Sequence, residues 1–273
     1  MIVDKDTLLI WSHFSDYMFY EAEHYYTFNG KRVKWSVTQF VSSVSQPFDK
    51  ETMSQRIAEK QGCTQKEILD NWQRNADISC CLGTIFHLRS ELYAQGKQFE
   101  IDYAEADKLG IRIEVETRMK KLIPMQDRFF SKIKGKLIPL KTEFTVGLGN
   151  TIAGNIDLLC WNEKEQEIQI WDYKTNKEIK MCNEFGKKML HEFADLDDCE
   201  YIHYSIQLGI YKEILQTKLG IKIGKCYLAY FNERNSDFIP IKCMDLSSKC
   251  KMALNRILQE TMLGDGYDRY NIK

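Results

Sequence analysis

Residues 152–161 read IAGNIDLLCW and residues 167–173 read EIQIWDY, and these two stretches decide the fold. Both are rich in β-branched and aromatic residues, and the pair Asn162-Glu163 between them is typical of a turn. A third run of the same kind extends from Thr142 to Leu148 and ends at Gly149-Asn150. The sequence therefore predicts three consecutive β-strands.

Helical patterns lie on both sides of these strands. Asp49 is an expected cap of one helix, and the capping box Thr64-x-x-Glu67 opens a second. The apolar spacing predicts further helices over residues 82–95, 111–131, 200–217 and 247–263. Two later strands are expected at 225–232 and 238–243, and a hairpin around Asn29-Gly30 followed by a short capped helix at 36–41.

This order of elements predicts an α/β fold in which helices flank a central mixed sheet. We expect one compact unit. Residues 1–80 form an N-terminal hairpin and helical extension in this interpretation, and residues 81–273 form the core.

The composition excludes several classes of protein. The chain has 273 residues, of which 44% are hydrophobic and 28% charged, a balance that argues against a disordered chain. No apolar run approaches the roughly 20 residues that cross a bilayer, so we expect no membrane partner. Nine cysteines, an odd number, and the absence of any Asn-x-Ser/Thr site favour a reducing, cytoplasmic location.

The chemistry is expected from Asp157, late in the second predicted strand, and from Asp172 and Lys174, at the end of the third. Side chains at positions i and i+2 of a strand share a face, so Asp172 and Lys174 project together. The 15-residue separation between the two aspartates suits neighbouring antiparallel strands joined by a short turn. Clustered carboxylates need a neutralising charge, and carboxylate oxygens are the ligands that Mg²⁺ prefers and Mn²⁺ accepts.

A pair of charges at a strand end can also be a plain surface ion pair. The apolar residues Ile168 and Ile170 beside this pair indicate instead a central strand. A metal ion held there lowers the pKa of its water and stabilises charge on a phosphodiester, and Lys174 would orient that water.

These segments resemble the PD-(D/E)XK nuclease superfamily, and within it the RecB-like exonucleases, including phage and mitochondrial members. The resemblance rests on four motifs in the family order: Gly83-x-x-x-His87, Gly154-x-Ile156-Asp157, Asp172-Tyr173-Lys174-Thr175 and Gln207-x-x-x-Tyr211. It implies a restriction-endonuclease-like core of the order αβββαβ behind a helical N-terminal extension.

The resemblance also implies roles for individual residues. His87, Asp157, Asp172 and the backbone carbonyl of Tyr173 would bind Mg²⁺ or Mn²⁺, and Asp157, Asp172 and Lys174 would be catalytic. Gln207, Tyr211 and Thr175 would contact the substrate or brace the catalytic strand. Some relatives carry an iron–sulfur cluster held partly by Cys-x-x-Cys; this sequence contains no such motif, so we predict no cluster.

Two further acidic residues are candidates to support the metal ligands, and one basic stretch is a candidate to bind phosphates. Glu91 lies one helical turn after His87, and Glu143 opens the first predicted strand. Residues 118–141 carry eight Lys and Arg against the single acid Asp127. In this stretch, Lys132 and Lys134 are expected to follow phosphates, although a solvated amphipathic helix is the alternative.

Together these features favour a divalent-metal-dependent exonuclease that acts on single-stranded or end-exposed DNA in replication, recombination or repair, with replication or recombination proteins as partners. Two alternatives stay open. One is a structure-specific endonuclease, and the other is a non-catalytic nucleic-acid-binding protein that retains the nuclease fold.

Overall fold

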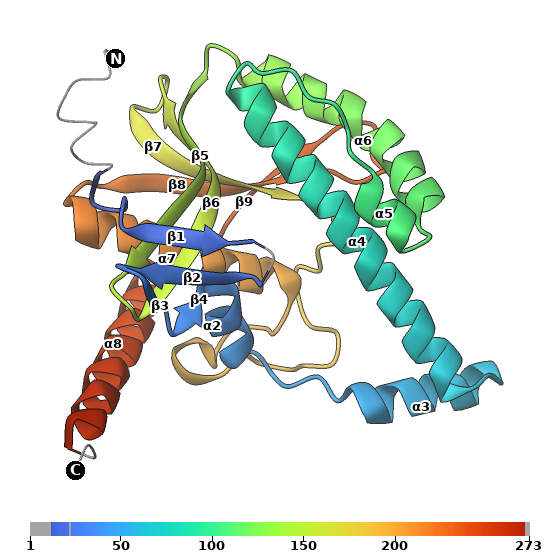
Figure 1. Ribbon diagram of the computed structural model, residues 1–273, viewed down its shortest axis with the longest axis horizontal. Helices are drawn as coiled ribbons and strands as arrows, with labels where there is room; N and C mark the ends of the chain where they lie inside the picture. The colour runs from blue at the N-terminus through green and yellow to red at the C-terminus, as the bar shows by residue number, and fades with distance from the viewer. Residues whose placement is uncertain (1–11, 22, 271–273) are drawn as a thin grey trace.

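The computed structural model describes residues 12–21 and 23–270, and its centre is a six-stranded mixed sheet (Figure 1). The strand order is β4-β6-β7-β8-β9, and β5 pairs with the other edge of β6. The bounds are β4 (Trp35–Ser36), β5 (Leu137–Leu148), β6 (Ile152–Asn162), β7 (Glu167–Lys174), β8 (Ile223–Tyr230) and β9 (Ile239–Lys242). The predicted α/β fold with a central mixed sheet is confirmed.

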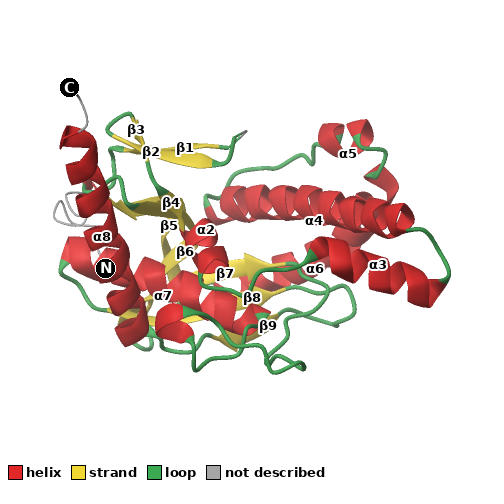
Figure 2. Ribbon diagram, turned by 90° about the horizontal axis from the view of Figure 1, so that it is seen from below, coloured by secondary structure: helices red, strands yellow, loops and turns green. Residues whose placement is uncertain are grey.

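Helices cover both faces of this sheet, as Figure 2 shows. On one face, α7 (Glu200–Leu219) and α8 (Ser247–Tyr270) pack with α2 (Val37–Ser43) and η1 (His191–Phe193). On the other, α6 (Arg112–Ile133) packs with α4 (Gln65–Ala94), and α5 (Ala104–Lys108) lies beside them. Each face therefore has its own apolar core, and the strands between them are buried on both sides.

The edge of β6 that faces β7 has two different partners. Its last five residues pair with β7, where Leu158 is opposite Trp171, whereas Ile152 and Ala153 pair with β4. Between these two pairings, β6 separates from β7. The separation begins at Asp157, and it leaves space for side chains at the point where β7 ends.

The N-terminal region contains a small sheet of β1 (Tyr17–Tyr20), β2 (Tyr25–Phe28) and β3 (Lys31–Arg32). Asn29 and Gly30 both have positive φ, 50° and 73°, as the predicted type I′ turn requires. The strand β1 was not predicted from the sequence. It packs against β5, so this sheet covers one side of the core.

The helix α4 differs most from the expectation. Thr64 caps it with the predicted capping box, but the two helices expected on either side of residue 80 are one helix of 30 residues. The helix opened at Thr64 and the one expected over 82–95 were interpreted as separate, whereas α4 runs through both without a break and packs on α3 (Lys50–Gln61) and α6. The predicted boundary between residues 80 and 81 falls inside this helix.

Other boundaries moved by a few residues. The strand β5 begins at Leu137 instead of Thr142, because it follows β6 to its end at Asn162. Asp49 caps α3 and Ser36 caps α2, as expected. Among the described helices, none combines the length and the apolar character that crossing a membrane requires.

Candidate metal centre

Asp157 and Asp172 lie opposite each other where β6 and β7 separate. They are the next residues after the last β6–β7 pair, Leu158 and Trp171, and both are buried. The Oδ2 atom of Asp157 accepts a hydrogen bond from the backbone N–H of Tyr173 at 2.7 Å. The antiparallel turn predicted from their spacing therefore brings the two carboxylates together.

His87 reaches this point from the C-terminal third of α4. Its Nδ1 atom lies 3.4 Å from Oδ2 of Asp157 and 3.6 Å from Oε1 of Glu143. Its Nε2 atom lies 3.2 Å from the carbonyl oxygen of Tyr173, the carbonyl expected among the metal ligands. One imidazole therefore contacts Asp157, Glu143 and the carbonyl of Tyr173. These groups, with His87 and Asp172, form the cluster.

Glu143 enters the cluster through an unusual backbone conformation. It lies in the middle of β5 with a φ of 43°, in the left-handed region that non-glycine residues rarely adopt. One donor atom each from His87, Glu143 and Asp157 lies within 4.8 Å of the others. A local distortion of this kind is often found where a strand aims a side chain at a functional site.

This donor set fits a divalent cation. Oε1 of Glu143 is buried without a hydrogen-bond partner among the described residues, with Nδ1 of His87 3.6 Å away, and Oδ2 of Asp172 has the ammonium of Lys174 as its partner. Buried carboxylate oxygens without a donor are costly unless a positive charge satisfies them. Two carboxylates and an imidazole, with Asp172 beside them, supply suitable ligands.

The protonation of the cluster reflects the same crowding of negative charge. Burial lowers the pKa of His87, but the carboxylates of Asp157 and Glu143 outweigh this effect and raise it to about 10. Burial raises the pKa of Asp157, but His87 and Lys174 bring it below its usual range. Burial, with repulsion from Asp157, raises the pKa of Glu143 as well, although His87 opposes the rise. Without metal, the positive imidazole is therefore the cation of the cluster, and we expect metal binding to release a proton.

Asp172 and Lys174 share a face of β7, as predicted. The Nζ atom of Lys174 lies 2.5 Å from Oδ2 of Asp172, while the side chains of Trp171 and Tyr173 lie in the opposite core. Burial lowers the pKa of Lys174, but Asp172 and Asp157 raise it well above its usual value, so the ammonium stays charged. The lysine that the sequence singled out is held at the edge of the cluster.

The helix α7 brings the Gln207 and Tyr211 pair to the catalytic strand. The Nε2 atom of Gln207 lies 3.5 Å from Oδ1 of Asp172 and 3.3 Å from the hydroxyl of Tyr211. The sequence interpretation missed Tyr204, one turn earlier on this helix, whose ring centroid is 4.6 Å from Nζ of Lys174. Its spacing of three residues from Gln207 was the available signal.

Other predicted residues lie away from the cluster. Glu91 accepts a hydrogen bond from Gln95 on the surface of α4. The carbonyl of Thr175 accepts a hydrogen bond from Arg118 at 3.3 Å. Among the described residues, neither Glu91 nor Thr175 makes a hydrogen bond or ion pair with His87, Glu143 or Asp157, although, besides burial, the charge of Glu91 contributes to the raised pKa of Glu143.

The basic stretch is largely compensated by acids from elsewhere in the chain. Lys132 makes an ion pair with Asp237 at 2.5 Å, and Arg128 shares the same carboxylate. Lys134 follows the last residue of α6 and precedes the start of β5. Glu143 lies in the middle of β5, away from that end. These positions contribute less free positive charge than their density in the sequence suggested.

The crowding of negative charge around Asp172 predicts how the stability of the metal-free protein depends on pH. Burial and Asp157 raise the pKa of Asp172 from 3.8 to about 6, so the native fold binds that proton more tightly than the unfolded chain. This contribution to the free energy of unfolding is fully present below about pH 3.8, the pKa of Asp172 in the unfolded chain. It is lost as the pH rises through about 6, the pKa in the native fold. We expect Asp172→Asn, which stays neutral, to stabilise the metal-free protein by about 1–3 kcal/mol at pH 8.

Urea unfolding in EDTA at pH 8 and at pH 4 measures this effect. The difference between Asp172→Asn and wild type is expected to disappear at pH 4, where Asp172 is protonated. A variant that is less stable than wild type at pH 8 would contradict the assignment of repulsion between the two aspartates.

Comparison with known proteins gives one family. A model of the PD-(D/E)XK nuclease superfamily matches residues 68–262, more than half of the chain. A crystal structure of a candidate exonuclease from Eubacterium rectale is similar, with 16% identity and a TM-score of 0.36, over 66% of this chain and 63% of that one. The structure of SSO0001 is similar with 13% identity and a TM-score of 0.28, over 64% of this chain and 85% of that one. The chain thus spans less than two thirds of the Eubacterium rectale structure, and no curated protein matches the sequence.

Proposed function

Because this chain belongs to the PD-(D/E)XK nuclease superfamily, whose members are metal-dependent hydrolases, we propose that it is a DNA exonuclease that requires Mg²⁺ or Mn²⁺. The observation that carries this proposal is the convergence of His87, Glu143 and Asp157 beside the Asp172–Lys174 pair. Single-stranded or end-exposed DNA is the proposed substrate, within replication, recombination or repair in the cytoplasm. The four ordered motifs support a place among the RecB-like enzymes, of phage or mitochondrial type.

The proposed metal ligands are His87, Glu143, Asp157 and Asp172, with the carbonyl of Tyr173. A bound divalent cation supplies a water of lowered pKa and a positive charge at the phosphate oxygens. Asp157 stays ionised and also fixes the end of β7 through the N–H of Tyr173. The strand is therefore held in place by the same carboxylate that faces the cation.

Lys174 is the proposed catalytic cation of the chain itself. Its ammonium lies beside Asp172 and over the ring of Tyr204, and its side chain is only 16% exposed. From this position it can donate hydrogen bonds to an attacking water or to a phosphate oxygen as negative charge develops. Gln207 orients the carboxylate of Asp172, so its role is in positioning.

The preference for DNA ends is supported by a bridge across one side of α4. Lys177, just after β7, donates a hydrogen bond to Asn75 of α4 at 3.0 Å. Phe48, between α2 and α3, contacts Trp72 with ring centroids 5.8 Å apart. The neighbouring Gln46 donates a backbone hydrogen bond to Asp198. Because these contacts join α4 to the segments after β7 and after α2, we expect a continuous duplex to be obstructed on this side and a single strand to enter by its free end.

Linear and circular single-stranded DNA of the same sequence test this proposal. With Mg²⁺ or Mn²⁺, we expect the linear strand to be shortened progressively and the circle to stay intact. Cleavage of the circle would assign an endonuclease instead. Retained binding without hydrolysis of either substrate in any divalent metal would assign a non-catalytic binding protein.

A further inference from the structure

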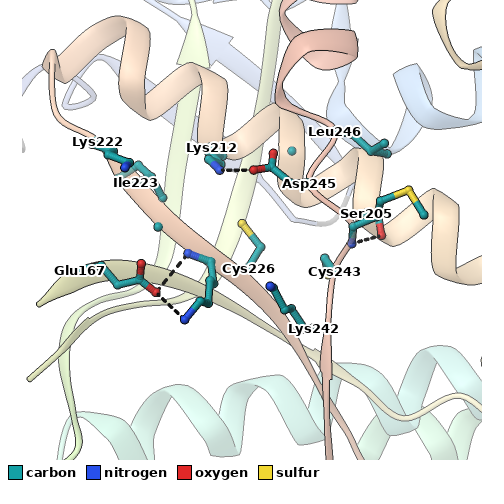
Figure 3. Close-up of a pocket in the computed structure, with 14 residues that line it drawn as sticks. Glu167, Ser205, Lys212, Lys222, Ile223, Cys226, Lys242, Cys243, Asp245 and Leu246 are labelled. Carbon is teal, nitrogen blue, oxygen red and sulfur yellow. Dashed lines mark hydrogen bonds and ion pairs between the residues drawn. The ribbon is translucent and has the colours of Figure 1, made fainter. Parts of the chain in front are cut away.

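A cavity of about 220 Å³ lies at the other end of β7 from the candidate metal centre. It is bounded by the start of β8, the middle of α7 and the segment between β9 and α8 (Figure 3). Glu167, which lines it, is the first residue of β7, and Lys174 is the last. At about 3.3 Å per residue, roughly 23 Å of strand separates these two residues. The wall at Cys243 comes nearer, since the charges of Asp172 and Lys174 act on that thiol, but none of the candidate metal ligands lines the cavity.

Lysines outnumber carboxylates around this cavity. Its charged lining consists of Lys212, Lys222, Lys225, Lys242, Glu167 and Asp245. Lys225 makes a close ion pair with Glu165, which lies outside the lining, and a longer one of 3.9 Å with Glu167. Three lysines therefore remain against two carboxylates.

Both carboxylates already accept hydrogen bonds from neutral donors. Glu167 accepts from the side-chain amide of Gln169 at 2.8 Å and from the backbone N–H of Lys225 at 3.4 Å. Asp245 accepts from the backbone N–H and the hydroxyl of Ser247, at 3.1 and 2.5 Å. Their oxygens are thus satisfied in part without the lysines.

Lys212 is the most buried of the three cations. Its side chain is only 14% exposed, and its ion pair with Asp245 is long, 3.4 Å, to a carboxylate that is 70% exposed (Figure 3). An ammonium carries three donors and loses much of its hydration in such a place. Within residues 12–21 and 23–270, no ion pair is found for Lys222 or Lys242, which lie at the mouth of the same cavity.

We propose that this cavity binds a phosphoryl group, held by Lys212, Lys222 and Lys242. The three ammonium groups can each donate to a compact oxyanion, and with Lys225 paired to Glu165 the lining carries one more positive than negative charge; lysine binds phosphate as a point charge. The choice of phosphate over other anions rests on the proposed function, since a nuclease works among nucleic-acid phosphates and phosphorylated products. The group belongs either to a nucleic-acid backbone or to a free nucleotide.

Binding of inorganic phosphate to the full chain, measured by calorimetry in EDTA, tests this proposal. We expect saturable binding to wild type and a loss of at least about tenfold in affinity in Lys212→Met. Lys212→Arg keeps the charge and is expected to retain binding. Lys218→Met is the matched control, because Lys218 is an exposed lysine of the same helix that does not line the cavity.

Absence of saturable binding to wild type would overturn the proposal, as would unchanged affinity in a folded Lys212→Met. Displacement of phosphate by a single-stranded oligonucleotide assigns the group to a nucleic-acid backbone. Displacement by a nucleoside monophosphate alone assigns it to a free nucleotide. Because EDTA prevents metal-dependent hydrolysis, failure of this site is distinguishable from failure of the proposed nuclease, which only the DNA substrates test.

Discussion

Replacing Lys174 with methionine is expected to lower the rate of DNA hydrolysis by about 10²–10⁴-fold, or about 3–5 kcal/mol in the transition state. Methionine keeps most of the aliphatic side chain over the ring of Tyr204. It removes the ammonium beside Asp172, and among the described residues no other lysine contacts that carboxylate. Since the lost hydrogen bonds form mainly as charge develops on the phosphate, the loss should fall on kcat more than on KM.

Single-turnover hydrolysis of an end-labelled strand at saturating Mg²⁺ measures this effect. Lys164→Met is the matched control, because Lys164 is an exposed lysine in the turn between β6 and β7, at the opposite end of β7 from Lys174. Its kcat should remain near that of wild type. Equal rates for folded Lys174→Met and wild type would remove Lys174 from the mechanism.

Replacing Asp157 with asparagine is expected to abolish metal binding in practice. The change is isosteric, and the new amide oxygen can still accept the hydrogen bond from Tyr173. It removes the negative charge that faces His87, so the affinity for Mn²⁺ should fall by more than about 100-fold, since even outer partners of metal ligands cost about 10–100-fold. Titration calorimetry with Mn²⁺ at pH 8 measures the affinity.

Two glutamates provide an internal comparison for this titration. Glu143 lies within the donor cluster, whereas Glu91 bonds to Gln95 on the surface of α4. We therefore expect Glu143→Gln to weaken Mn²⁺ binding and Glu91→Gln to leave it unchanged. Equal effects of the two substitutions would show that charge near the cluster matters and ligand position does not.

Much of the strand geometry could be predicted from short-range rules. The alternation of side chains along β7 placed Asp172 and Lys174 together and sent Trp171 to the opposite core. The short turn between two apolar runs placed Asp157 opposite Asp172. Both conclusions depend on residues close in sequence, where the period of a strand and the length of a turn leave few alternatives.

Interactions between distant segments were harder to predict. The left-handed conformation of Glu143 carries no signal of its own in the sequence, yet it brings this side chain to His87. The positive charge of Lys132 seemed free because its partner Asp237 lies about a hundred residues later. The continuity of α4 depends likewise on packing against α3 and α6, which local propensity does not contain.

The central claim is that side chains from α4, β5, β6 and β7 share one divalent cation. Anomalous diffraction from crystals soaked in Mn²⁺ tests it most directly. We predict a single strong peak within about 2.5 Å of donor atoms from His87, Asp157 and Glu143 or Asp172. An empty cluster at saturating Mn²⁺, in crystals where the protein is otherwise unchanged, would contradict the account.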